Sequence, residues 1–269
     1  MTKRRVCAIL LVLYDISSEM SRVLRKKSAF AVGGKGRKSM IGMIGIIGAM
    51  DVEMEALLSA LENKESEMVS GVTFTRGKLY GREAVLAVCG IGKVAAALCA
   101  EAMILRYQPD AVINIGVAGT LTDRLSIGDM AIGSAAVCHD MDTTAIGDPP
   151  GWISGLDRVE IPLSRELADA FEDACRSVGV RSYRGVIASG DQFISDREKK
   201  KEIAERFSAV ACEMEGQAIS QVCFVNDTPC AILRSISDNA DGSAAEYEKF
   251  KYLAASHSTT VLHAFLEKK

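Results

Sequence analysis

Short apolar runs alternate with helix-like stretches from residue 43 to the C-terminus of the chain. The runs "MIGMIGIIGAM", "DAVINIGVAG" and "TPCAILRSIS" are typical of buried strands, whereas "GKVAAALCAEAMILRYQ" and "RELADAFEDACRSVG" are typical of helices. This alternation predicts a mainly parallel sheet with helices on both faces, because parallel strands need crossover connections. "VTFTRGKLYGREAVLAVCG" has turn residues between two alternating stretches and predicts an antiparallel hairpin. We therefore expect an α/β fold.

The composition narrows the class of protein. Of 269 residues, 48% are hydrophobic and 25% are charged, as in an ordinary globular enzyme, and the formal net charge is -3. We do not expect nucleic acid or an anionic membrane to be the main partner of such a chain. The eight cysteines form no C-x-x-C pair, so we expect small core side chains in a reducing cytoplasm. Cysteines and histidines lack metal-ligand spacing, so we expect no metal.

Residues 1–42 differ in character from the rest of the chain. The run "VCAILLVLY" is too short to span a bilayer, and no small-residue cleavage site follows it as in a signal peptide. "GGKGRKS" requires purine-rich codons, like a ribosome-binding site read as protein, so Met40 and Met43 are alternative starts to Met1. We predict an N-terminal extension over residues 1–42, untranslated or disordered, and a single domain over residues 43–269.

Polar residues and glycines collect after the predicted strands, where ligands bind in open α/β sheets. The stretches concerned are "GAMDVE", "CGIGKVA", "IGVAGT", "SGDQFIS", "ACEMEG" and "LRSISD". They contain three acids that we expect to be buried, namely Glu53, Glu215 and Asp238. Alternation along an extended strand would place Arg234, Ile236 and Asp238 on one face. Paired carboxyl groups suit hydrolysis of a glycosidic bond, because one protonates the leaving group while the other activates water.

Each of these residues also has a purely structural interpretation. Glu53 could be a solvated first-turn acid, and Glu213 and Glu215 could begin a solvated helix. Asp238 lies in a turn-rich stretch, where it could cap a turn. The apolar candidates could equally be core residues: Met50, Met214 and Phe193. Their joint occurrence at successive strand ends favours a binding site.

Six motifs occur together in the order and approximate spacing of one enzyme family. They are "GIIGAMDVEMEAL", "GIGKVAAAL", "INIGVAGTL", "SGDQFIS", "CEMEGQAIS" and "RSISDNAD". Through them the chain resembles the 5′-methylthioadenosine/S-adenosylhomocysteine nucleosidases from about Met43 to its C-terminus. The resemblance implies a three-layer α/β/α sandwich with a central mixed, mostly parallel twisted sheet, as in nucleoside phosphorylases, and a cytoplasmic homodimer. It also implies hydrolysis of the bond between adenine N9 and ribose C1′ in methionine salvage, without a cofactor.

The resemblance further implies a role for each candidate residue. Asp238 matches the general acid that protonates adenine N7, so its carboxyl group must keep a proton near neutral pH, which burial against a purine favours. Glu53 matches the residue that activates water, and Arg234 is expected to orient that water. Glu215 matches the acid that binds the ribose hydroxyls, while Glu213 is a helix-start acid or supports Glu215. The other expected substrate contacts are Met214 at the sugar, Phe193 stacked on adenine, the backbone of Ile194 at the adenine edge, Gly119, Met50 and Ile91.

Three alternatives stay open at this point. A phosphorylase usually carries an arginine and a hydroxyl to hold phosphate where this chain has Asn114 and Val117, and Glu53 would repel phosphate. A nucleosidase for a related nucleoside, such as 5′-deoxyadenosine or a futalosine-type substrate, would differ only at the 5′ pocket. A non-catalytic binder of adenine nucleosides would show no turnover. The sequence leaves open the roles of Tyr247 and of residues 141–158, a region that in the family helps to build the partner subunit's 5′ pocket.

Overall fold

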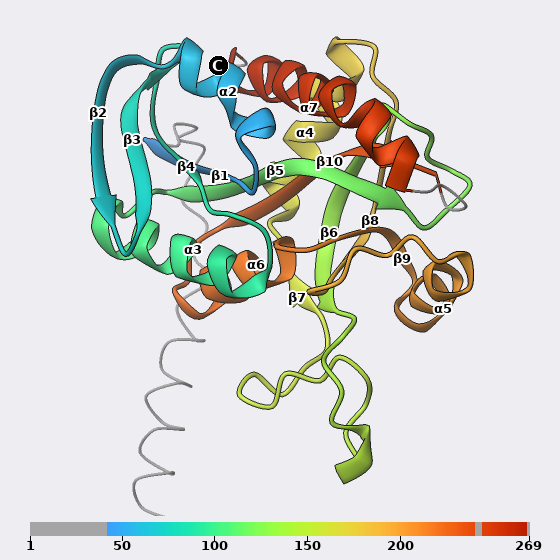
Figure 1. Cartoon of the computed structure of the whole chain (residues 1–269). Helices are drawn as coiled ribbons and strands as arrows, with labels where there is room; N and C mark the ends of the chain where they lie inside the picture. Colours follow the sequence, from blue (N-terminus) through green and yellow to red (C-terminus); the bar gives the residue numbers. More distant parts are fainter. Residues whose placement is uncertain (1–41, 240–243, 268–269) are drawn as a thin grey trace, which may run out of the picture. The chain divides into compact units, whose positions relative to one another are not determined.

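The structure is a computed structural model that describes residues 42–239 and 244–267. The predicted N-terminal extension and the choice of start codon lie outside these ranges and stay predictions. The described residues form a mixed ten-stranded sheet with helices packed on both faces (Figure 1). The predicted α/β class is confirmed.

The strands are β1 (Met43–Gly48), β2 (Glu62–Val69), β3 (Val72–Leu79), β4 (Arg82–Val88), β5 (Ala111–Thr120), β6 (Met130–Cys138), β7 (Ile161–Pro162), β8 (Ser182–Ser189), β9 (Ala209–Glu213) and β10 (Cys230–Asp238). The helices are α2 (Asp51–Ala60), α3 (Lys93–Tyr107), α4 (Arg165–Ser177), α5 (Arg197–Phe207), α6 (Gly216–Val225) and α7 (Ala244–Glu267), with a short 3₁₀ turn, η1, at Thr144–Ile146.

The buried strand β5 organises the sheet. It runs parallel to β1 on one side and to β10 on the other, and all ten of its residues are buried. β10 pairs antiparallel with β6, β6 pairs parallel with β8, and β8 pairs parallel with β9. β9 in turn pairs antiparallel with the last residues of β5. On the far side of β1, the predicted hairpin is present as antiparallel β3 and β4, with β2 at the edge. The carboxyl ends of β5, β9 and β10 therefore meet in one region.

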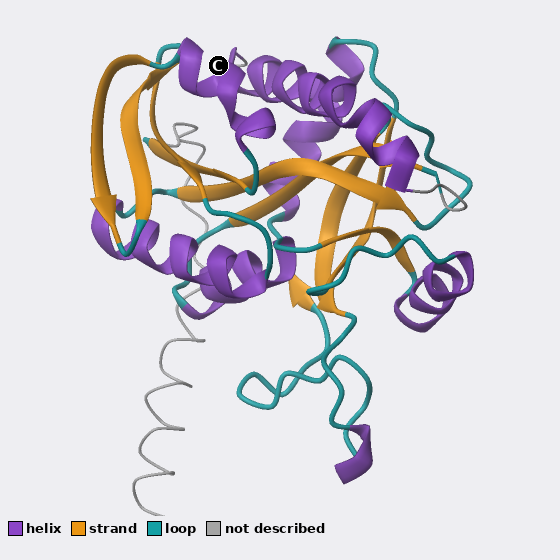
Figure 2. Cartoon of the chain, in the orientation of Figure 1, coloured by secondary structure: helices purple, strands orange, loops and turns teal. Residues whose placement is uncertain are grey.

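The helices form two layers around this sheet (Figure 2). α2, α4 and α7 pack on one face, where a buried apolar cluster includes Met54, Phe171 and Leu262. α3 and α6 pack on the opposite face over a second cluster that includes Met103 and Ile219. Burial of apolar side chains on both faces explains why the central strands read as continuous apolar runs rather than as alternating ones.

Side-chain caps fix where two helices begin. The Asp196 carboxylate caps α5 by accepting a hydrogen bond of 2.8 Å from the backbone N–H of Lys199. Ser164 caps α4 in the same way, through the backbone N–H of Leu167. Within residues 42–239 and 244–267, no helix combines the length and the apolar character needed to cross a bilayer.

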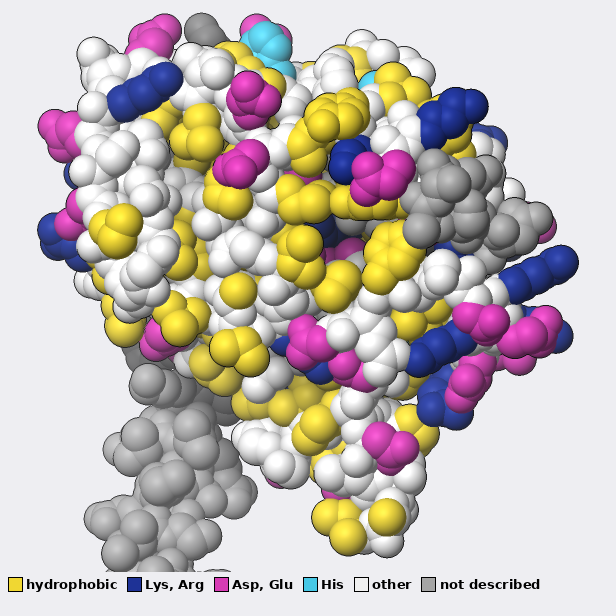
Figure 3. Space-filling view, viewed as in Figure 1, with side chains coloured by type: hydrophobic (Ala, Val, Ile, Leu, Met, Phe, Trp, Pro, Cys, Tyr) yellow, Lys and Arg dark blue, Asp and Glu magenta, His cyan; other side chains and the backbone are white. Residues whose placement is uncertain are grey.

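An apolar surface follows the outside of α3 and α6. Figure 3 shows hydrophobic side chains along this part of the molecule. A groove of about 410 Å³ runs between the two helices and the long segment that projects from the sheet between β6 and β7. Its wall includes Val94, Met141 and Val225, and the side chain of Val94 is 78% exposed.

Candidate active site

A cavity of about 340 Å³ lies beside the carboxyl ends of β1, β5, β9 and β10. Its lining residues are Ala49, Met50, Glu53, Ile91, Val117, Ala118, Gly119, Phe193, Cys212, Glu213, Met214, Glu215, Ser237, Asp238 and Tyr247. The volume falls within the range of small-molecule sites, which is about 300–1,000 Å³. The lining combines an apolar majority with four carboxylic acids, a composition that suits a ligand with an apolar body and several hydrogen-bonding groups.

Glu53 is fixed by the backbone at the start of α2. Its Oε2 accepts hydrogen bonds from the N–H groups of Ala49 at 2.8 Å and Met50 at 3.0 Å, and its Oε1 accepts one from Val117 at 3.0 Å. Burial raises the pKa of the Glu53 carboxyl above its ordinary value, and this effect is opposed by the positive charge of Arg234 and by the three backbone donors. The result is a rigid carboxyl group with an enhanced tendency to take up a proton.

Two glycines of β5 make room for charged side chains of the neighbouring strand. Arg234 pairs with Gly116 across the β5–β10 register, and Asp238 pairs with Gly119. A methyl group on Gly116 would overlap the Arg234 guanidinium and lie 2.5 Å from Glu53 Oε1. A methyl group on Gly119 would lie 2.7 Å from Asp238 Oδ2. The glycines in "IGVAGT" therefore let these side chains lie directly against the backbone of β5.

Asp238 ends β10 at an irregularity in the strand. The register shifts between Ile236 and Asp238, so that Ser237 and Asp238 both line the cavity, while Ile236 packs in the core. The prediction that Ile236 and Asp238 share one face of the strand is wrong for this reason. Asp238 Oδ1 accepts a hydrogen bond of 3.0 Å from the hydroxyl of Ser237, and its Oδ2 accepts one of 2.6 Å from Lys200.

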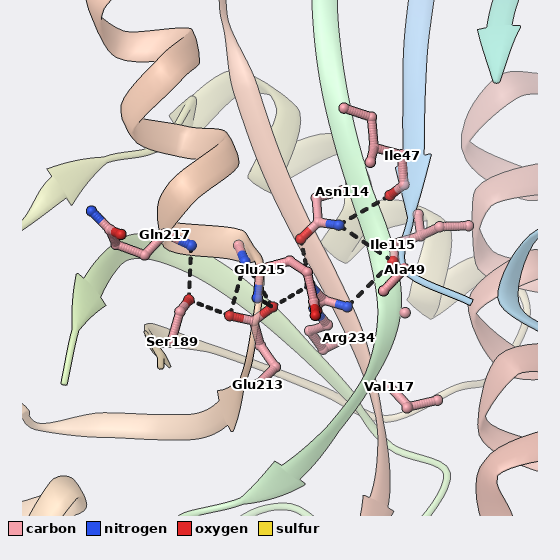
Figure 4. Close-up of polar contacts among 12 residues, drawn as sticks. Ile47, Ala49, Asn114, Ile115, Val117, Ser189, Glu213, Glu215, Gln217 and Arg234 are labelled. Atoms are coloured by element: carbon pink, nitrogen blue, oxygen red, sulfur yellow. Dashed lines mark hydrogen bonds and ion pairs between the residues drawn. The ribbon is translucent and has the colours of Figure 1, made fainter. Parts of the chain in front are cut away.

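Arg234 holds two neighbouring glutamates together beneath the cavity (Figure 4). Its guanidinium forms a buried ion pair with Glu213 and lies 3.6 Å from Glu215 Oε2, and it also donates to the side-chain oxygen of Asn114. Glu213 in addition accepts hydrogen bonds from the backbone N–H groups of Glu215 and Gly216 at the start of α6. Glu213 is thus a helix-start acid and a support for Glu215 at once, and both glutamates are buried rather than solvated.

Glu215 lies between the N-termini of two helices. It occupies the N-cap position of α6, and its Oε1 accepts a hydrogen bond of 2.9 Å from the N–H of Gly92, the N-cap of α3. Burial, together with the adjacent negative charge of Glu213, raises the pKa of Glu215 to about 7, although Arg234 and the Gly92 N–H oppose the shift. Near neutral pH this carboxyl group therefore changes between proton donor and proton acceptor.

The opposite wall of the cavity is apolar and aromatic. The rings of Phe193 and Tyr247 meet edge to face with centroids 5.4 Å apart, and the Tyr247 hydroxyl lies 3.2 Å from the Met50 sulfur. Phe193 remains 48% exposed, and Ile91 is exposed beside it on the cavity wall. Such a wall offers flat contact area for a planar aromatic group.

Eight of the ten predicted site residues line this cavity: Met50, Glu53, Ile91, Gly119, Phe193, Met214, Glu215 and Asp238. The other two, Arg234 and Ile194, are not among its lining residues. Arg234 is buried below Glu213 and Glu215. The side chain of Ile194 packs with Leu121 and Phe207 in a separate cluster, so the prediction for its backbone stays a prediction.

Sequence reasoning missed Lys200, which reads as part of a solvated helix face in "REKKKEI". A signal was present, because Lys200 lies three and seven residues before Ile203 and Phe207, the other two buried residues of α5. Tyr247, whose role was left open, is part of the cavity wall. Within the described ranges, no group of three or more His, Cys, Asp or Glu side chains is arranged to hold a metal ion.

Comparison with known proteins relates residues 43–267 to the family model of the phosphorylase superfamily. The 5′-methylthioadenosine/S-adenosylhomocysteine nucleosidase of Shewanella sediminis is 40% identical over 227 residues, covering 83% of this chain and 98% of that protein. The nucleosidase of the same name from Neisseria meningitidis, solved with methylthio-immucillin-A, superposes with a TM-score of 0.81 at 33% identity and covers 85% of this chain and 100% of its own. A futalosine hydrolase of Helicobacter pylori also superposes with a TM-score of 0.81 at 33% identity, covering 86% and 99%.

Proposed function

This chain belongs to the phosphorylase superfamily and, within it, to the 5′-methylthioadenosine/S-adenosylhomocysteine nucleosidases, and from that premise we propose a mechanism for its cavity. The enzyme hydrolyses the N-glycosidic bond of 5′-methylthioadenosine and S-adenosylhomocysteine, releasing adenine and the 5-thio-substituted ribose, a reaction of methionine salvage. The observation that carries the proposal is that Glu53, Glu215 and Asp238, three buried carboxylic acids from separate elements, line one cavity.

Asp238 is the general acid. Adenine leaves poorly as an anion, so a proton must reach its N7 as the bond to C1′ breaks. Asp238 is buried at the end of β10, and the cavity in front of its carboxyl group has the Phe193–Tyr247 wall, which suits a purine ring. Stacking of adenine on Phe193 would bring the base into the same apolar space.

Glu53 is the general base. Loss of adenine leaves an oxocarbenium-like sugar, and Glu53 removes a proton from the water that attacks C1′. Three backbone donors hold the carboxyl group in place beside the positive charge of Arg234, and its raised pKa strengthens it as a proton acceptor. Arg234 acts on the attacking water indirectly, through the Glu53 carboxyl group. Its own guanidinium lies below the cavity wall and does not line the cavity.

Glu215 binds the ribose hydroxyls, with Met214 beside the sugar. In its ionised form Glu215 accepts hydrogen bonds from two neighbouring hydroxyls, and the N-termini of α3 and α6 favour that form. Arg234 holds the carboxyl group from behind, and Glu213 accepts a hydrogen bond from the backbone N–H of Glu215. The site therefore fixes the sugar between Asp238, which protonates the adenine, and Glu53, which activates the attacking water.

Water rather than phosphate is the nucleophile. Four carboxylic acids, Glu53, Glu213, Glu215 and Asp238, face two buried cations, Arg234 and Lys200. Arg234 is occupied by Glu213 and Asn114, and Val117 offers no hydroxyl on the cavity wall. An excess of negative charge and the lack of a free donor at these positions disfavour a phosphate dianion.

The assay that tests this proposal is adenine release from 5′-methylthioadenosine, followed by chromatography in buffers with and without phosphate. We expect release without phosphate, together with free methylthioribose. Release that requires phosphate would instead indicate a phosphorylase. A futalosine-type nucleoside belongs in the same assay, because a futalosine hydrolase superposes as well as the nucleosidase does. Binding of nucleosides without any turnover would indicate a non-catalytic binder.

A second copy of the chain covers the apolar groove between α3, α6 and the segment from β6 to β7. Exposed side chains on this surface, including Val94, Met141 and Val225, support a homodimer, because a contiguous exposed apolar patch of this kind is typical of an interface. Val94→Asp should shift the protein from dimer to monomer in sedimentation velocity. A monomeric wild-type protein would contradict the assignment.

Residues 43–269 form the nucleosidase domain, and the compartment is the cytoplasm. The seven cysteines of the described residues are all buried, as expected of small core side chains in a reducing compartment.

A further inference from the structure

Lys200 is a buried lysine on a helix where the flanking lysines are exposed. α5 carries Lys199, Lys200 and Lys201 in succession, and only the middle side chain is buried, with 1% of its surface exposed. Burial of an ammonium group is costly unless its charge is paired and its N–H groups are hydrogen-bonded. Here the nitrogen donates to Asp238 Oδ2 at 2.6 Å and to the carbonyl oxygen of Asn239 at 2.7 Å. Lys200 is therefore held against the proposed general acid.

Lys200 and Asp238 stand between two cavities. Asp238 lines the catalytic cavity, whereas Lys200 lines a second cavity of about 590 Å³ formed by the loop after β5 and by α5. Exposed charged residues lie on the wall of this second cavity: Asp123, Arg197, Lys201 and Glu205. The second cavity thus connects Lys200 with bulk water at a place separate from the substrate.

We propose that Lys200 and Asp238 form a proton relay, in which Lys200 supplies the proton that Asp238 donates to the leaving adenine and is itself reprotonated through the second cavity. The inference rests on the proposed function and extends it by one residue. Lys200 does not contact the substrate in this scheme, because it acts through Asp238.

The protons and electrons balance over one turnover. A proton moves from Lys200 Nζ to Asp238 Oδ2, and Asp238 passes a proton to adenine N7 while the electron pair of the glycosidic bond goes to N9. Water forms its bond to C1′ and gives a proton to Glu53. Glu53 then releases this proton to solvent, and Lys200 takes one up from the second cavity. The net reaction is the addition of one water molecule across the bond.

Substrate binding favours the first transfer. A purine that fills the catalytic cavity excludes water from the Asp238 carboxylate, which faces the Lys200 ammonium on its other side. Desolvation disfavours both charged groups, and moving one proton from nitrogen to oxygen turns the ion pair into a neutral pair. The acid is thus supplied with its proton only when adenine is in place.

Other titratable groups around the pair respond in different pH ranges. Burial raises the pKa of Cys212 on β9 to about 12, and burial also raises the pKa of Tyr247 on α7 above its ordinary value. Both therefore stay uncharged below about pH 10. Across the catalytic cavity, Glu215 titrates near pH 7 and belongs to the acid limb of the pH profile. The remaining charged groups on the walls of the two cavities are Glu53, Glu213, Asp123, Arg197, Lys201 and Glu205.

Two substitutions of Lys200 separate the relay from a merely structural role. In Lys200→Met, Asp238 must hold its proton alone. We therefore expect kcat near the wild-type value at about pH 6, whereas the fall of kcat on the alkaline side should begin about one pH unit or more below that of the wild type. In Lys200→Arg, the positive charge and the ion pair remain, but a guanidinium does not give up its proton, so kcat should fall by about tenfold or more at every pH. Lys199→Met, at the exposed neighbouring position of α5 and outside the walls of both cavities, is the matched control and should keep the wild-type profile.

The measurement is kcat and KM for adenine release from 5′-methylthioadenosine across about pH 5 to 10, with circular dichroism to verify folding. If Lys200→Met is unfolded, Lys200→Arg keeps the pair and decides the question. A wild-type alkaline limb in Lys200→Met, or a wild-type kcat in Lys200→Arg, would overturn the relay while leaving the nucleosidase assignment intact. A wild-type enzyme that releases no adenine would instead overturn the proposed function.

Discussion

Gly119 pairs with Asp238 across the β5–β10 register, and a methyl group at Gly119 would lie 2.7 Å from Asp238 Oδ2. This contact is too short for an unstrained Cβ atom, so Gly119→Ala is expected to displace the carboxyl group. Misplacement of a reacting group by about 1 Å can cost about 100-fold in rate, so we expect kcat to fall by about ten- to 100-fold with a smaller change in KM. Steady-state kinetics on 5′-methylthioadenosine measure both quantities.

A double-mutant cycle controls this experiment. If Gly119→Ala acts only through Asp238, it should add almost nothing to the defect of Asp238→Asn. Additive losses in the double mutant would mean that the methyl group disturbs another part of the site.

Asp238→Asn tests the general acid directly. Asparagine can still accept a hydrogen bond from Lys200, but it has no proton to pass to adenine N7. We expect kcat to fall by about 100- to 10,000-fold while the nucleoside still binds. Asp227→Asn is a suitable control, because Asp227 is exposed and has a left-handed backbone that asparagine tolerates. Near-normal turnover in Asp238→Asn would remove Asp238 from the acid role.

Glu53→Ala tests the general base through chemical rescue. The change leaves the N–H groups of Ala49, Met50 and Val117, together with Arg234, around an empty carboxylate position. We expect loss of activity by about 100-fold or more and partial recovery with formate, a small carboxylate that can bind these donors and accept a proton. Chloride at equal ionic strength is the control. Recovery with both anions, or with neither, would argue against Glu53 as base.

Much of the fold follows from hydrophobic pattern alone. β1, β5 and β10 are buried on both faces and read as continuous apolar runs, so their positions were predictable. β2 was not, because "ENKESEMV" has the composition of a solvated segment. It is a strand because its backbone pairs with β3 at the edge of the sheet, where charged side chains remain in water. Pairing between distant segments, such as β9 with β5, leaves no mark on local composition.

The candidate site also has features that were predictable from the sequence and features that were not. Acids at strand ends were predictable as a group, because parallel strands bring their carboxyl ends to one region. The position of Arg234 below the cavity was not, since it depends on Glu213, Glu215 and Asn114 meeting from three separate elements. Likewise, nothing local in the sequence shows that the side chain of Ile194 packs with Leu121 and Phe207.

Glu215→Gln should affect stability and activity in opposite directions. The pKa of Glu215 is raised to about 7 in the folded protein, first by burial and then by Glu213, whereas the ordinary value is 4.5. Between these pH values the folded protein retains a proton that the unfolded chain has released. The free energy of unfolding therefore falls as pH rises through this window, and above it the whole destabilisation by the ionised Glu215 is present. Glutamine does not ionise, so Glu215→Gln lacks this destabilisation.

Urea unfolding of both proteins at about pH 5 and about pH 8 checks this sign. At the higher pH we expect Glu215→Gln to be more stable than the wild type by roughly 1–3 kcal/mol, and at the lower pH nearly equal to it. The pH dependence of the free energy of unfolding that remains in Glu215→Gln comes in part from Glu53, whose pKa is also raised. Glu55→Gln, on the exposed side of α2, should keep the wild-type slope. Equal slopes in the wild type and Glu215→Gln would show that position 215 is not the group that titrates. In the same stabilised variant the ribose hydroxyls lose a charged acceptor, so KM should rise by about ten- to 100-fold. This combination is expected of a site whose acids are retained for binding rather than for stability.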